Sequence, residues 1–181
     1  MTSVSDAWLS EQADREHSSA FEALFYAHYD RVYGLLFRLV GNRGEAEDLT
    51  QEVFIKFYKH AFAKGRDHNI SAWLYRVATN TGYNAIRSRN RRWRRNTELL
   101  ADPGDEPPDP AATLSRQETQ QQVRATLARL PRRDVQLLLL RQMGHSYAEL
   151  AEICDVAPGS VGTLLRRAAD AFRREYREKN E

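Results

Sequence analysis

The chain has 181 residues and a formal net charge of +2, and 41% of its residues are hydrophobic while 29% are charged. This composition is typical of a globular chain that forms one ordinary domain or two small ones. An apolar run of roughly 18 residues is missing, which argues against a membrane-spanning helix and against membrane insertion. Because Cys154 is the single cysteine, no internal disulfide can form, and we expect a cytoplasmic protein.

Residues 18–96 are expected to form a helical module that follows an N-terminal extension at residues 1–17. The extension lacks the basic start and the apolar core of a signal peptide. Within the module, hydrophobic side chains recur at helical spacing, and no sustained alternation indicates a strand. Three helices are predicted: one from Phe21 to the GNRG segment at 41–44, one from Glu45 to Ala63, and one from Ile70 to Arg92.

The second of these helices carries an acidic outer face that contains Asp48, Gln51, Glu52 and Ile55. An ordinary solvated face is the common explanation for such acids. An exposed isoleucine among them favours a surface for a protein partner. Acid–base catalysis or metal binding by the paired carboxylates is disfavoured, because no histidine or third carboxylate converges on them.

The third helix has a core side and a second side that combines one indole, two amides and three guanidiniums. This combination suits unpaired bases, since the ring can stack, the amides can read base edges and the guanidiniums can hold phosphates. In the alternative explanation the tryptophan anchors the core and the arginines form a solvated face; the residues alone do not decide between the two. The residues on this side are Trp73, Arg76, Asn80, Asn84, Arg87 and Arg91.

Residues 97–114 contain four of the six prolines in the chain, and they are rich in acids. Such a segment cannot bury enough apolar surface to hold a fold, so a flexible acidic linker is predicted. The chain is therefore expected to be all-α, with two small helical domains on either side of this linker.

Residues 115–181 predict a helix-turn-helix. Ser146 and Glu149 have the spacing of a capping box at the start of a helix. Asp155 follows that helix where the turn needs a residue that tolerates left-handed backbone geometry, and Pro158 suits the first turn of the next helix.

The last helix combines an inward apolar stripe with an outer face of arginine and short polar residues. Such a face can enter the major groove and contact phosphates and base edges. Arginines could also simply solvate a C-terminal helix and favour its dipole. The capping box, the turn and the second helix in register favour DNA binding. The expected DNA-contacting residues are Ser160, Thr163, Arg166, Arg167 and Arg173.

Together these segments resemble a bacterial extracytoplasmic-function (ECF) sigma factor of the sigma-70 family, group 4. The resemblance rests on FEALFYAHYDRVYGLLFRLVGNRGEAEDLTQEVFIKFYKH, on WLYRVATNTGYNAIRSRNRR and on LARLPRRDVQLLLLRQMGHSYAELAE. It implies a sigma-2 helical bundle at 18–96 and a sigma-4 helix-turn-helix domain at 115–181. It also implies that the linker passes through the polymerase toward the RNA exit path.

The resemblance further implies the partners. These are core RNA polymerase, through its β′ clamp and β flap, and promoter DNA, both duplex and single-stranded; an anti-sigma factor is a common partner in the family. The acidic face, here including Glu47, would dock on the clamp. The stretch from the KGRDHN loop at 64–69 through Arg92 would bind and help melt the −10 element, and the last helix would read the −35 element. No enzymatic activity, metal or cofactor is implied.

The sequence departs from the family at Gly162 and Leu164, where basic or polar residues are usual. The resemblance therefore does not define the −35 sequence that this chain would read. Two other functions stay under consideration. One is a stand-alone helix-turn-helix regulator whose first module dimerises on a two-fold symmetric site. The other is an enzyme acting on nucleic acid, with a metal held by Asp48 and Glu52.

Overall fold

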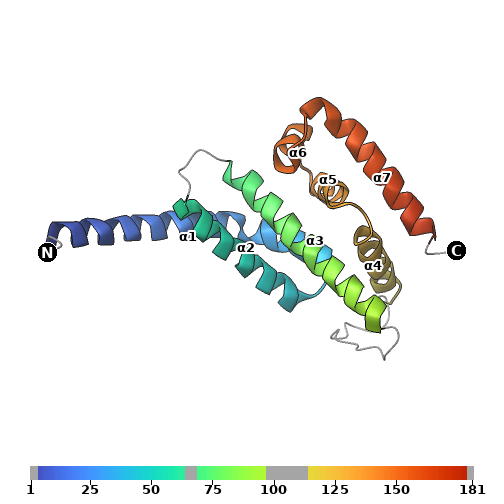
Figure 1. Cartoon of the computed structure of the whole chain (residues 1–181), viewed down its shortest axis with the longest axis horizontal. Coiled ribbons are helices and arrows are strands. Elements are labelled where there is room, and N and C mark those ends of the chain that lie inside the picture. The colour runs from blue at the N-terminus through green and yellow to red at the C-terminus, as the bar shows by residue number, and fades with distance from the viewer. Residues whose placement is uncertain (1–3, 64–68, 97–113, 179–181) are drawn as a thin grey trace.

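The computed structural model describes residues 4–63, 69–96 and 114–178, which are almost entirely helical (Figure 1). No strand occurs within these residues, so the predicted all-α class is confirmed. None of the helices described there is long and apolar enough to cross a membrane. The elements are α1 (Val4–Val40), α2 (Arg43–Ala63), α3 (Ile70–Asn96), α4 (Leu114–Leu127), α5 (Arg132–Gln142), α6 (Tyr147–Cys154), the 3₁₀ turn η1 (Pro158–Ser160) and α7 (Val161–Glu178).

Two helix boundaries differ from the sequence-based expectation. The first helix begins at Val4, so residues 4–17 continue α1 instead of standing apart from it. The third helix extends past Arg92 to Asn96, because the arginine-rich segment contains no glycine or proline that would end it. The predicted linker at 97–114 lies outside the described residues, except for Leu114 at the start of α4.

The first three helices form a bundle whose core is made of fully buried aliphatic side chains. Leu35, Leu36 and Leu39 of α1 meet Val53 of α2 and Leu74 of α3, and all five are 0% exposed. Burying a side chain of this size contributes about 1.5 to 3 kcal/mol relative to leaving it in water. This core therefore fixes the orientation of α2 and α3, the two helices that carry the predicted binding faces.

Gly82 allows α1 and α3 to approach closely. A Cβ atom at this position would lie 2.7 Å from Cδ1 of Leu39 and 3.0 Å from Cδ2 of Leu36, both fully buried. We expect Gly82→Ala to lower the free energy of unfolding by about 1 kcal/mol, because overpacking costs more than the gain in helix propensity.

The matched control is Gly44→Ala in α2, where the nearest atom to the new Cβ would be the Asn42 side-chain oxygen at 3.5 Å. This control should gain up to about 1 kcal/mol from helix propensity. Urea unfolding followed by circular dichroism compares the two variants, and equal gains in both would contradict the close packing at Gly82.

The helices α4 to α7 form a second bundle around α5, which packs against α6 and α7. Its buried core includes Val135, Leu137 and Leu140 of α5, Leu150 of α6 and Val161 of α7. Figure 1 shows α3 between α1 and α2 on one side and α4 to α7 on the other. The third helix thus contributes to the packing of both bundles.

Candidate nucleic-acid and polymerase interfaces

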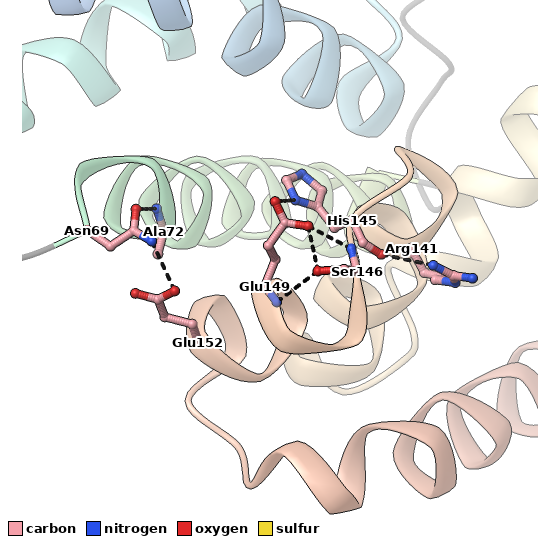
Figure 2. Close-up of polar contacts among 7 residues, drawn as sticks. All are labelled: Asn69, Ala72, Arg141, His145, Ser146, Glu149 and Glu152. Carbon is pink, nitrogen blue, oxygen red and sulfur yellow. Dashed lines mark hydrogen bonds and ion pairs between the residues drawn. The ribbon is translucent and has the colours of Figure 1, made fainter.

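The start of α6 is fixed by the predicted capping box, which is confirmed (Figure 2). The hydroxyl of Ser146 accepts a hydrogen bond from the Glu149 backbone N–H at 3.3 Å. In return the Glu149 carboxylate accepts from the Ser146 backbone N–H at 2.7 Å and from its hydroxyl at 2.8 Å. The Ser146 backbone bond is the main cause of a lowered pKa for Glu149, followed by the hydroxyl bond. These contacts satisfy N–H groups that the first turn of a helix leaves without partners.

The turn between α6 and α7 depends on Asp155. Its backbone has φ 54° and ψ 55°, in the left-handed region, and its N–H donates to the carbonyl of Ala151. Among the described residues it is the one non-glycine with a positive φ. Pro158 then opens the 3₁₀ turn that leads into α7. Both sequence predictions for this turn are confirmed, and together they set the direction in which α7 leaves α6.

A substitution series at Asp155 tests this geometry. We expect Asp155→Ala to lower the free energy of unfolding by about 1 kcal/mol, because a Cβ without a local polar partner disfavours the left-handed region. Asp155→Asn should leave the free energy of unfolding nearly unchanged, and Asp155→Gly should be at least as stable as the parent chain. Thermal unfolding orders the three variants; an alanine variant as stable as the glycine variant would contradict the backbone assignment.

The predicted face of α7 points away from the bundle. Val161 and Ala168 are 0% exposed and hold the helix to its neighbours. Gly162 is partly covered by Tyr147, whose Cε2 atom would lie 3.5 Å from a Cβ at that glycine. Arg173 forms an ion pair with Asp170 at 2.7 Å. All five residues predicted to contact DNA are exposed, namely Ser160, Thr163, Arg166, Arg167 and Arg173.

Exposed acids also line the outer face of α2, as predicted. Glu52 pairs with Lys56, which lies one turn further along the helix. Ile55 is 54% exposed, which is unusual for a large aliphatic side chain in a helix that packs well on its other side. The exposed residues of this face are Glu47, Asp48, Gln51, Glu52 and Ile55.

The predicted face of α3 is not one open surface, because neighbouring helices cover part of it. Trp73 is half-buried and its ring lies 5.8 Å from the ring of Phe57, toward α2. Arg76 and Asn80 are half-buried and make hydrogen bonds with the second bundle. The other three predicted residues, Asn84, Arg87 and Arg91, are exposed. A projection groups residues by direction around one helix, and it carries no information about what a distant segment covers.

Sequence reasoning missed the polar residues that join the two bundles. Gln136 in α5 is 6% exposed, and its amide donates to the Thr79 hydroxyl at 2.6 Å. Tyr83 donates from its hydroxyl to the Leu130 carbonyl at 2.8 Å. The available signal was Gln136 itself, because an amide within the apolar run VQLLLL needs a buried partner.

Cys154 ends α6 close to this contact and is half-buried. Burial raises the pKa of its thiol to about 11, although the positive charges of Arg76 and Arg133 act in the opposite direction. Such a thiol is almost entirely protonated near neutral pH, and the protonated form is a poor nucleophile.

The two helical segments correspond to two regions of one class of transcription factor. The family model of sigma-70 region 2 matches residues 24–92, which span the C-terminal part of α1, all of α2 and most of α3. The family model of sigma-70 region 4 matches residues 120–171, which include the helix-turn-helix. The order of these matches along the chain is that of a sigma factor.

Similarity to whole proteins identifies the group of sigma factors to which the chain belongs. The chain is 30% identical to the ECF RNA polymerase sigma-E factor of Escherichia coli K12, with 93% of each chain covered. It is 29% identical to the ECF RNA polymerase sigma factor SigW of Bacillus subtilis, over 93% of this chain and 95% of the relative. The chain belongs to the ECF group of the sigma-70 family.

A solved structure shares the fold. The sigma factor RpoE of Bartonella quintana, crystallised with the anti-sigma factor NepR, aligns with a TM-score of 0.56 at 21% identity. This alignment covers 87% of the present chain and 97% of that chain.

Proposed function

We propose that this chain acts as a promoter-specificity subunit that binds core RNA polymerase, contacts the −35 and −10 elements and promotes DNA melting. Sigma factors are transcription initiation factors and not enzymes, so the proposed mechanism consists of binding steps alone. The observation that carries the proposal is the α7 face, where exposed arginines lie on the second helix of a helix-turn-helix whose cap and turn are both formed.

The −35 step is assigned to α7. Thr163, Arg166 and Arg167 lie exposed in the first half of this helix, which is the half that a helix-turn-helix inserts into the major groove. Guanidiniums can bind guanine edges in a bidentate manner or hold phosphates. Gly162 and Leu164 offer no polar group there, so base reading rests on the neighbouring threonine and arginines.

Docking on the polymerase is assigned to the acidic face of α2. Its carboxylates would meet a basic surface on the β′ clamp, and Ile55 would supply apolar area at the centre of the contact. The β flap is the expected contact of the second bundle. An anti-sigma factor is the further partner that we propose for this chain, since a structural neighbour was solved in complex with one.

The −10 step is assigned to α3. Asn84, Arg87 and Arg91 are exposed on it and can contact the backbone and bases of an opened strand. Arg76, Asn80 and Trp73 would extend the same surface toward the start of the helix. Flipping a base out of the stack costs a few kcal/mol, which stacking and pocket contacts would offset.

In vitro transcription tests the proposal. Purified core RNA polymerase is incubated with a pool of genomic fragments, with and without this chain. We expect discrete new start sites that share a pair of short upstream motifs. Absence of new starts, together with a shift of duplex DNA by the chain without polymerase, would overturn the proposal in favour of a stand-alone regulator.

A further inference from the structure

Tyr147, the first residue of α6, exposes an aromatic ring at the start of the helix-turn-helix. The residue is 49% exposed, and within the described part of the second bundle it is the one large hydrophobic residue that is so exposed. A single exposed ring is common on protein surfaces, so the groups around it decide what it can do.

One neighbour of the ring is Gly162, the second residue of α7. A Cβ atom at this glycine would lie 3.5 Å from Cε2 of Tyr147, which is ordinary van der Waals contact. The ring therefore lies directly against the place where a side chain of residue 162 would begin. At this point α6 supplies side-chain surface that α7 itself does not have.

This point belongs to the part of α7 that approaches DNA in a helix-turn-helix. Gly162 and Arg166 lie one turn apart on the same side of α7, and the Arg166 side chain is exposed. Figure 1 shows α6 beside the N-terminal end of α7. Residues near this end of the second helix contact base edges in the major groove. The Tyr147 ring thus extends the surface that presents Thr163 and Arg166.

Arg141 of α5 holds the ring in one orientation. Its guanidinium carbon lies 5.3 Å from the centroid of the Tyr147 ring, which is a cation–π contact. Its Nη1 also donates to the carbonyl of His145 at 3.0 Å (Figure 2). The capping box fixes the backbone at Ser146, next to the tyrosine. A ring that is already positioned loses little conformational freedom when a ligand binds to it.

We propose that Tyr147 is a specificity-determining residue of the −35 interface, and that its ring contacts the C5-methyl group of a thymine. The inference rests on the proposed function, because it concerns the duplex-binding surface assigned there to α7. Thymine is the base that presents an apolar group in the major groove, and apolar side chains read it by contact. Thr163 and Arg166 supply polar groups for base edges and phosphates, whereas the ring supplies the apolar surface beside them.

Deoxyuridine tests the contact directly, because it differs from thymidine in the pair only by lacking the C5-methyl group. The −35 element is taken from promoters found in the transcription experiment described above. Each thymine on either strand is replaced in turn, and the labelled duplexes are titrated with the chain assembled on core RNA polymerase. We expect one replacement to weaken binding about fourfold, the change that corresponds to removing one methyl group from an apolar contact.

Variants of the tyrosine assign that effect to the ring. Tyr147→Ala should bind the thymine and uracil duplexes equally, and Tyr147→Phe should keep the fourfold difference because it keeps the ring. The matched control is Tyr26→Ala on α1, where the side chain is 78% exposed and far from α7 in the fold (Figure 1). This control should also keep the difference. Circular dichroism should show equal helicity in all three variants.

Two results would overturn the proposal. In the first, no single replacement weakens binding by the parent chain, or Tyr147→Ala shows the same fourfold loss as the parent. In the second, Tyr147→Phe loses affinity for every duplex alike, which would indicate a hydrogen bond from the hydroxyl to a phosphate instead of a methyl contact. In both cases the chain still directs new transcription starts, so this outcome differs from failure of the proposed function, in which no new starts appear.

Discussion

Replacing Arg166 and Arg167 together by alanine is expected to reduce transcription from a target promoter by roughly 100-fold. Both guanidiniums are exposed on the outer face of α7, so their loss should leave the helix and its packing intact. Each arginine that contacts a base edge or a phosphate contributes about 1 to 3 kcal/mol to DNA binding. If both hold phosphates, the dependence of duplex affinity on salt should become less steep by about two units of the log–log slope.

A matched variant separates this effect from a general loss of positive charge. Arg31→Ala with Arg38→Ala removes the same charge from exposed positions on α1. We expect this variant to retain both promoter output and duplex affinity. Equal losses in the two double variants would show that net charge, and not the face of α7, governs binding, and unchanged output in both would remove the assignment of that face.

Reversing the charge of Asp48 is expected to weaken association with core RNA polymerase by about tenfold to 100-fold. The carboxylate lies exposed on the acidic face of α2, beside Glu52 and close to Ile55. Asp48→Arg would bring like charges together at a basic surface, which costs several kcal/mol when the contact is close. Anisotropy of a labelled chain titrated with core polymerase measures the change.

Glu118→Arg on α4 is the matched control for Asp48→Arg, since it makes the same change of charge at another exposed acid. Circular dichroism should show equal helicity in both variants. Normal association of Asp48→Arg, or an equal loss in Glu118→Arg, would remove the acidic face of α2 from the docking surface.

Local features were predictable from the sequence because their causes lie within a few residues. The capping box of Ser146 and Glu149 needs one helix start, and the left-handed turn at Asp155 needs one tolerant residue. The outward direction of Arg166 and Arg167 follows from the spacing of apolar residues in α7. In each case neighbouring residues decide the geometry, so a single sequence is sufficient.

The division of the α3 face was not predictable in the same way. Arg76 and Ile153 are 77 residues apart, and Gln136 and Thr79 are 57 residues apart. No periodicity within either segment encodes a contact across such a separation. The same arginines and amides satisfy the pattern of an open face and of a covered one, and only the packing of the second bundle distinguishes them.

The position of α3 between the two bundles has an evolutionary consequence. A substitution at Arg76 or Asn80 changes both the surface of α3 and its contact with the second bundle. At these two positions, neither property can change in evolution without the other. A substitution at Gln136 changes the contact and leaves the chemistry of α3 as it was. Substitutions that change the strength of the contact between the two bundles should therefore accumulate on α5 and α6. Substitutions on α3 should be fewer, because both bundles pack against it.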